Sequence, residues 1–198
     1  DNLEVLKNWL SWVVIRAYSP YLSDAFVKER FGFYGTKLTG QPVNRPRWKR
    51  AVGLVEGSLG EAVGQIYVEK HFPPSSKQHM DKLVGHLIEA YRQSITNLEW
   101  MTEETKAKAL EKLSKFTPKI GYPTKWKDYS SIEIARDDLV TNVANVSSWE
   151  FDYHANKIGS PIDKDEWHMT PQTVNAYYNP GLNEIVFPAA ILQPPFFS

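Results

Sequence analysis

The chain has 198 residues, of which 42% are hydrophobic and 13% aromatic, enough for one hydrophobic core or a core and part of a second. This composition excludes an intrinsically disordered chain. Lysine plus arginine and aspartate plus glutamate each number 23, so the formal net charge is zero, which argues against a dedicated nucleic-acid binder. Cysteine is absent, which excludes a disulfide framework, a cysteine-ligated metal and a thiol nucleophile. No apolar run approaches the ~18 residues of a membrane-spanning helix, so we expect no membrane insertion.

Helical periodicity dominates the first third of the chain. Apolar residues recur at spacings of three and four from Leu3 to Ala17, which predicts an amphipathic helix that ends before Pro20. After a second short helical stretch, residues 39–46 disfavour regular structure, and a long helix is expected from Pro46. Four glycines spaced four, three and four along that helix indicate a face that another backbone approaches closely: Gly53, Gly57, Gly60 and Gly64.

The next helix is predicted after Pro73 and Pro74, with a cap at Ser75 or Ser76. Apolar residues at helical spacing form its packing face: Met80, Leu83, Val84, Leu87, Ile88, Tyr91, Ile95 and Leu98.

Two further helices follow in the sequence. Thr102 is expected to cap a short helix with acidic residues in its first turn and lysines later, the order that the helix dipole favours. Residues 119–129 predict a connector that packs its aromatic side chains, because Gly121 and Pro123 break the helical pattern. A last helix is expected from about residue 137 to 157. Everything to this point predicts a helical bundle.

The pattern changes near Thr173. Residues Val174 to Tyr178 alternate like a strand, turn residues follow at 179–181, and Glu184 to Phe187 is a second β-prone run. We therefore predict a β-hairpin. The tail at 188–197 is too apolar for water and too rich in proline for a helix or a central strand, so it is expected to need a partner surface.

The five histidines do not follow a metal-site pattern. A helical zinc site needs two histidines four residues apart with a glutamate beside the first, and no pair here has that spacing. His79 and His86 lie seven apart on one predicted helix with Glu89 beyond them, but Leu83 lies between them on the packing face. This favours surface or capping histidines. No Gly-x-Ser-x-Gly elbow supports a serine hydrolase.

Three clusters of charge, one basic and two acidic, are better explained as solvated faces and helix starts. Basic residues surround Trp48, a mixture also used for nucleic-acid contacts, but they stand at a predicted helix start in a chain of zero net charge: Arg45, Arg47, Lys49 and Arg50. The acidic groups lack the pattern of a calcium loop: Asp137 and Asp138, and separately Asp163, Asp165 and Glu166.

The predicted strand from Val174 to Tyr178 carries the candidate binding residues. Asn175 followed by the small Ala176 at a strand edge would offer an amide side chain and an uncovered backbone to an extended peptide. An ordinary hairpin whose asparagine merely turns the chain explains the same residues. The residues alone leave both interpretations open.

The same region resembles the neprilysin family of zinc metalloendopeptidases. Residues 173–178 read T-V-N-A-Y-Y, and residues 183–197 read N-E-I-V-F-P-A-A-I-L-Q-P-P-F-F. The family has an Asn-Ala-[Phe/Tyr]-Tyr strand followed by an Ile-Val-Phe-Pro-Ala-x-Ile-Leu-Gln-Pro-Pro-Phe-Phe run. The resemblance covers essentially the whole chain through further matches: Arg47-Trp48, Leu59-Gly60, Ile66-Tyr67-Val68, Leu98-x-Trp100-Met101, Thr105-Lys106-x-x-Ala109, Ile120-Gly121-Tyr122-Pro123 and Asp163-x-x-x-Trp167.

The resemblance implies a fold and a substrate. It implies a mainly α fold, with the helical bundle of the domain that caps a thermolysin-like catalytic domain. Residues 1–140 would be part of that helical domain, and residues 141–198 would be a linking helix and the start of the catalytic domain, with its hairpin. Asn175, through its side chain, and Ala176, through its backbone, would bind the main chain of a peptide substrate.

The resemblance also implies a zinc cofactor that this chain does not hold. The family's zinc ligands lie on a His-Glu-x-x-His helix and a downstream glutamate, which this sequence lacks, so no catalytic or metal-binding residue is assigned here. They are expected beyond Ser198, in the remainder of the catalytic domain. The segment alone is therefore expected neither to retain zinc nor to cleave peptides.

We thus expect an internal segment of a zinc-dependent endopeptidase. The lack of cysteine and the amino-acid sequence of several stretches favour a bacterial member, cytoplasmic or secreted. The alternative is a noncatalytic, all-helical interaction module that only shares ancestry with the peptidases. The apolar tail would be covered in the parent protein by residues missing here, so part of it is expected to be exposed, disordered or packed against a second copy.

Overall fold

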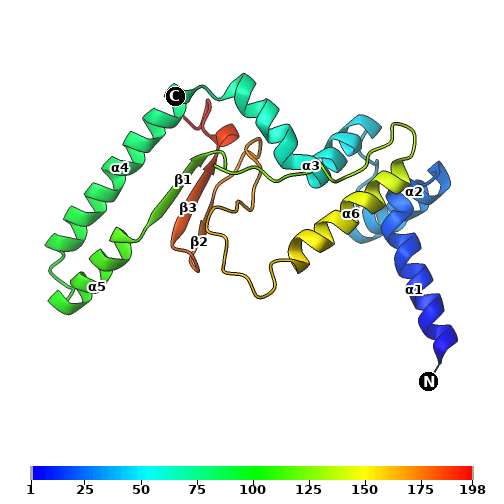
Figure 1. Cartoon of the computed structure of the whole chain (residues 1–198), viewed down its shortest axis with the longest axis horizontal. Coiled ribbons are helices and arrows are strands. Elements are labelled where there is room, and N and C mark those ends of the chain that lie inside the picture. Colours follow the sequence, from blue (N-terminus) through cyan, green and yellow to red (C-terminus); the bar gives the residue numbers. More distant parts are fainter. Residues whose placement is uncertain (1, 198) are drawn as a thin grey trace. The chain divides into compact units, whose positions relative to one another are not determined.

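A computed structural model describes residues 2–197 of the chain, which forms two compact units (Figure 1). Unit 1 combines Asp1–Ser58 with Tyr129–Ser160, and unit 2 combines Leu59–Asp128 with Pro161–Ser198. The predicted mainly helical fold is confirmed, with six α-helices and one small sheet among the described residues.

Unit 1 is built from helices with strong local signals. Helix α1 (Leu3–Tyr18) ends before Pro20 as predicted, and α2 (Asp24–Phe31) continues into a π-helical segment at Gly32–Lys37. Helix α6 (Leu139–Ala155) is capped by Asp138, whose Oδ1 accepts from the Thr141 N–H at 3.0 Å. A bond from the Thr141 hydroxyl to Oδ2, together with this backbone bond, holds the pKa of Asp138 below its usual range. The acidic pair at 137–138 thus marks a helix start.

Helix α3 (Arg47–His71) begins one residue after Pro46 and is interrupted at Leu59, where φ is −128° and ψ is 32°. The predicted glycine face is closely packed at Gly64 but not at Gly57. A Cβ on Gly64 would lie 2.8 Å from Pro171 Cδ, whereas a Cβ on Gly57 would meet nothing within 4 Å. The groups that approach Gly64 are the side chains of Pro171 and Gln172, whereas another backbone was predicted.

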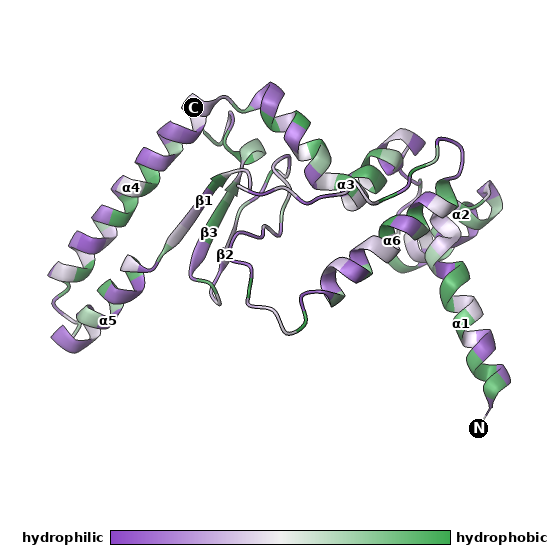
Figure 2. Cartoon of the chain, viewed as in Figure 1, coloured by the Kyte–Doolittle hydropathy of each residue, from purple (hydrophilic) through white to green (hydrophobic). Residues whose placement is uncertain are grey.

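Helices α4 (Pro74–Asn97) and α5 (Glu103–Ser114) follow in unit 2. The predicted serine cap of α4 is wrong, because Pro74 occupies the first helical turn, where its missing N–H is no loss, and Pro73 is the extended cap residue. The predicted cap of α5 is confirmed by the Thr105 N–H, which donates to Thr102 Oγ1 at 3.3 Å. Hydrophobic and hydrophilic bands alternate along α4 (Figure 2). Its predicted apolar face is buried at Met80 and Val84, while three of its members are largely exposed: Leu83, Leu87 and Tyr91.

The sheet has three strands in the order β1-β3-β2 (Figure 1). Strand β1 (Thr117–Gly121) pairs in parallel with β3 (Glu184–Pro188), and β2 (Tyr177–Asn179) pairs with β3 antiparallel. The predicted hairpin is therefore present, but β1 lies in a region that the sequence assigned to helix and connector. The strand was not predicted because it contains Pro118 and Lys119, and neither residue type is common in strands.

The turn before β3 is closed by Asn183, a non-glycine residue with positive φ, at 52°. Its carbonyl oxygen accepts from the Thr117 N–H at 3.0 Å, and its amide nitrogen donates to the Lys112 carbonyl at 2.8 Å. Its amide oxygen accepts from the Tyr178 hydroxyl at 3.1 Å. One residue therefore contacts α5, β1 and β2.

The core of unit 2 forms where α3, α4, β1 and the residues after β3 meet. Its buried members come from segments far apart in the sequence: Phe72, Met80, Val84, Ile120, Ala189 and Leu192. The connector packs its aromatics as predicted, with Tyr122 edge-on to Phe72 and stacked on Trp126.

The apolar tail is only partly exposed. Ile191 and Phe197 pack against this core, and Leu192 belongs to it, so this chain itself covers much of the tail that was expected to need residues from elsewhere. Phe196, by contrast, is 69% exposed.

Candidate peptide-binding edge

Strand β2 is an edge strand. It pairs with β3 on one side, and no strand among residues 2–197 pairs with its other side (Figure 1). An edge of this kind presents unpaired backbone N–H and C=O groups to an added strand. A free edge next to an exposed polar side chain is an arrangement by which proteins bind extended peptides.

The two predicted binding residues lie immediately before β2, whereas the sequence placed them inside the strand. The Asn175 N–H donates to the Thr173 carbonyl at 3.0 Å, a tight local turn, and the paired residues begin at Tyr177. Continuing the register would place Asn175 opposite Pro188, which has no N–H to donate. The ladder therefore ends before Asn175.

The side chain of Asn175 is exposed and bonded to its own backbone neighbour. Its Oδ1 accepts from the Ala176 N–H at 2.8 Å. A carboxamide has one acceptor oxygen and two N–H donors, so this bond leaves the donors available. The arrangement can donate a hydrogen bond from Nδ2 to a peptide carbonyl.

Residues 166–171 form a strap that is hydrogen-bonded to β2 through His168. The His168 N–H donates to Tyr177 Oη at 3.0 Å, and the two rings lie 5.7 Å apart. Burial raises the pKa of Tyr177, and the backbone bond from His168 partly offsets this rise. Tyr177 belongs to the Asn-Ala-Tyr-Tyr motif, but no role was predicted for it, because the motif carries no signal for a partner nine residues away.

A buried ion pair is hydrogen-bonded to the same strap. Lys119 Nζ lies 2.6 Å from Glu184 Oε2 and donates to the Glu166 carbonyl at 3.1 Å. Glu184 is 1% exposed, and its Oε1 has no hydrogen-bond partner among the described residues. Sequence reasoning missed this pair, since charged residues are rarely buried unless they are paired, and the pairing is long-range.

No group of three or more metal-binding side chains converges among residues 2–197. His79 and His86 both lie on α4, as the sequence suggested. The described residues therefore do not fit a zinc site of three protein ligands.

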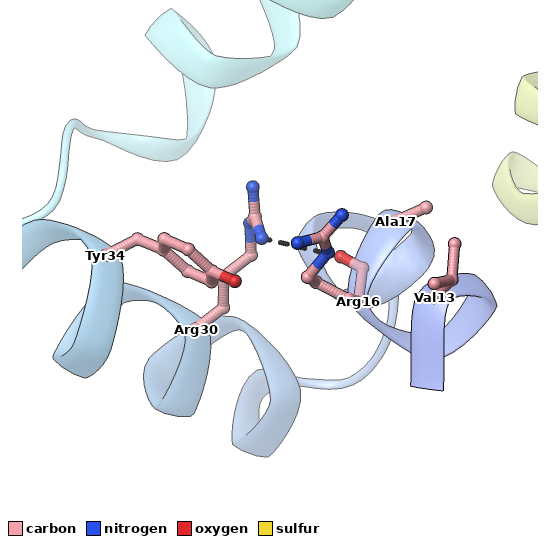
Figure 3. Close-up of a pocket in the computed structure, with 5 residues that line it drawn as sticks. All are labelled: Val13, Arg16, Ala17, Arg30 and Tyr34. Atoms are coloured by element: carbon pink, nitrogen blue, oxygen red, sulfur yellow. Dashed lines mark hydrogen bonds between the residues drawn. The ribbon is translucent and has the colours of Figure 1, made fainter. Parts of the chain in front are cut away.

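A cavity of about 290 Å³ in unit 1 brings together arginines from two helices (Figure 3). An Arg30 N–H donates to the Arg16 carbonyl at 3.4 Å. The Arg16 guanidinium lies 4.6 Å from the Trp12 ring centroid and that of Arg30 lies 4.7 Å from Tyr34. These charges are stabilised by aromatic rings and solvent, so the cavity supplies no reactive group.

The basic cluster at the start of α3 is also a surface feature. Trp48 is 65% exposed, and Lys49 Nζ lies 5.4 Å from its ring centroid. The Arg50 Nε donates to the Arg45 carbonyl at 3.2 Å, which fixes the chain before the helix. The cluster therefore forms a solvated helix start, as the sequence favoured.

Comparison with known proteins identifies the family to which this chain belongs. A model described as peptidase family M13 matches residues 1–123, and a second model with that description matches residues 175–198. The chain belongs to peptidase family M13, the neprilysin family, as the motifs at residues 173–197 indicated.

Solved structures and curated relatives agree with this assignment. The chain aligns over its full length with the Mycobacterium tuberculosis zinc metalloprotease Zmp1 in complex with an inhibitor, at 56% identity and a TM-score of 0.90, and covers 30% of that protein. It aligns over 92% of its length with PepO from Lactobacillus rhamnosis, at 32% identity and a TM-score of 0.84, and covers 29% of it. Neprilysin of Mus musculus is 34% identical over 98% of the chain.

The chain spans 27% of the length of mouse neprilysin, and its share of the two bacterial structures is similar. Among the described residues, no helix combines the length and the apolar character needed to cross a membrane.

Proposed function

We propose that this chain is a segment of a zinc-dependent endopeptidase that hydrolyses peptides. It contributes a helical region and an edge that binds the substrate main chain through Asn175 and Ala176. The observation that carries this proposal is the open edge of β2, with the exposed Asn175 carboxamide at its start. Membership of peptidase family M13 supports the reaction class.

The contacts at the edge suggest how a peptide would be held. The Ala176 N–H is bonded to Asn175 Oδ1, so the free groups are the Asn175 amide protons and the Ala176 carbonyl. We propose that Nδ2 donates to a substrate carbonyl and that the Ala176 carbonyl accepts a substrate N–H. This pair of bonds recognises the peptide backbone and leaves side-chain specificity to other residues.

We propose that the zinc ligands belong to other residues of the parent protein, because those described here do not fit a zinc site. When bound, zinc would activate the water that attacks the peptide bond. The role of this chain is to hold the substrate.

We also propose that residues 1–140 belong to the helical domain and residues 141–198 to a linking helix and the start of the catalytic domain. The second family match, which begins at residue 175, supports a change of region before that position. The alternative of a noncatalytic interaction module is not favoured, since both matching models describe peptidases.

The test is Asn175→Ala in the parent protein. Loss of a neutral hydrogen bond to the substrate weakens binding by about 0.5–1.5 kcal/mol, so we expect turnover of peptides at low concentration to fall roughly two- to tenfold. Zinc content, measured by metal analysis, should stay unchanged because the residue does not touch the metal site.

Asn179→Ala is the matched control. Asn179 lies at the far end of β2, where its Oδ1 accepts from the Gly181 N–H at 3.1 Å in the turn. It should change peptide kinetics by less than about twofold, the effect of a distant turn bond. Unchanged kinetics in Asn175→Ala, or equal losses in the two variants, would contradict the role of Asn175.

A further inference from the structure

The hydroxyl of Tyr177 joins the strap at residues 166–171 to the edge strand. It accepts from the His168 N–H at 3.0 Å. Tyr177 is also the first residue of the β2 ladder, paired with Val186 on β3. The same residue therefore begins the strand and fastens it to the strap.

The strap is itself fixed to the rest of unit 2. The Glu166 carbonyl accepts from Lys119 on β1, and the Pro171 carbonyl accepts from the Ala190 N–H at 2.8 Å. Trp167, which lies between Glu166 and Pro171 in the sequence, is buried. A segment held at both ends and by a buried tryptophan is a firm support for anything bonded to it.

Asn175 is held on its N-terminal side by its own N–H, which donates to the Thr173 carbonyl at 3.0 Å, and Thr173 is bonded in turn to Thr170 of the strap. Asn175 is exposed, lies outside the ladder, and is separated from Tyr177 by one residue, so an extended chain places the two about 7 Å apart. On its C-terminal side, the position of the Asn175 carboxamide depends on the first residue of the ladder, which is Tyr177.

We infer that Tyr177 is a positioning residue for peptide binding: its hydroxyl, held by the His168 N–H, sets the place of the Asn175 carboxamide. The inference rests on the proposed function, because it needs Asn175 to contact the substrate. Tyr177 does not itself touch the peptide in this assignment, and its hydroxyl acts only through the strand.

The neighbouring Tyr178 is a matched control. Its hydroxyl donates to Asn183 Oδ1 at 3.1 Å, at the turn end of the sheet, and its ring stacks on Phe116. Adjacent residues of a strand point to opposite faces, so Tyr178 faces away from the strap. Removing either hydroxyl deletes one hydrogen bond, but of these two bonds the one at Tyr177 is made to the strap.

The experiment compares peptide hydrolysis by the parent protein and four variants: Tyr177→Phe, Tyr178→Phe, Asn175→Ala and the double variant Asn175→Ala/Tyr177→Phe. Tyr177→Phe should raise KM about threefold to tenfold, change kcat by less than about twofold and leave zinc content unchanged. Tyr178→Phe should leave KM within about twofold of the native value.

The double variant shows whether the hydroxyl acts through Asn175. With Asn175 already truncated, the added Tyr177→Phe change should have little further effect on KM, because coupled residues are not additive. An equal rise in KM in both backgrounds would overturn the inference, as would a Tyr178→Phe variant that matches Tyr177→Phe.

The outcomes also separate this inference from the proposed function. If Asn175→Ala weakens turnover but Tyr177→Phe has native KM, only the positioning role of Tyr177 is wrong. If Asn175→Ala has native kinetics, the proposed binding edge is wrong, and the inference falls with it.

Discussion

The two units differ in what buries their apolar side chains, although helices dominate both. In unit 1, helices α1 and α2 have no buried residue, and among the described residues Val146 is the only hydrophobic side chain of this unit that is buried. In unit 2, helices, sheet and tail share one core. Local signals are therefore enough to form a helix, whereas a core requires contacts between segments far apart in the sequence.

The largest effect should come from truncating an aromatic side chain in the core of unit 2. Phe72 is 5% exposed and contacts Tyr122 edge-on, so Phe72→Ala should lower the free energy of unfolding by about 3–5 kcal/mol. Urea denaturation followed by tryptophan fluorescence measures this change.

Trp12→Ala is the counterpart in unit 1. Trp12 is 52% exposed on α1, so its removal should lower stability by less than about 1 kcal/mol. If the Trp12 variant lost as much stability as the Phe72 variant, burial would not separate the two units.

Alanine substitutions at two glycines of α3 should have smaller effects on stability, and the two effects should be opposite in sign. In unit 2, Gly64→Ala would bring a Cβ to 2.8 Å from Pro171 Cδ, and overpacking of this kind destabilises by about 1–3 kcal/mol. In unit 1, Gly57→Ala meets nothing within 4 Å and should stabilise the helix by up to about 1 kcal/mol. Thermal unfolding of the two variants measures both shifts, and shifts of the same sign would show that the helix is packed alike on both sides of Leu59.

The smallest effect concerns alkaline pH and Tyr177. Burial raises the pKa of Tyr177 above its ordinary value of about 10, so its contribution to stability is full below pH 10 and is lost as pH rises through the folded-state pKa. Tyr177→Phe removes this ionisation, and its stability should fall less steeply above pH 10 than that of the native chain. Denaturation midpoints between pH 9 and 11 measure the slopes, with Tyr178→Phe as the control, and identical slopes for Tyr177→Phe and the native chain would refute the effect.

The sequence predicted what depends on neighbours along the chain. The apolar spacing around Met80 and Val84 located α4, and Thr102 located the start of α5, because both features act within one or two helical turns. The alternation after Thr173 and the turn residues at 179–181 located the hairpin, and the resemblance at residues 173–197 located the family.

The predictions from the sequence failed where residues far apart in the chain determine the structure. Strand β1 contains Pro118 and Lys119 and exists because it pairs with β3, more than sixty residues later. The ion pair of Lys119 with Glu184 follows from that pairing and could not be anticipated without it. The start of β2 was placed too early because Pro188, on the opposite strand, ends the ladder.

The turn residue Asn183 limits which substitutions the sheet can accept. Glycine is the usual choice at a φ of 52°, and on backbone angle alone the two residues would be interchangeable. A glycine, however, could keep only the bond from the Thr117 N–H and would lose those to Lys112 and Tyr178. At this position, mutational tolerance is set by the side chain, and the residue that best suits the backbone would be the poorer replacement.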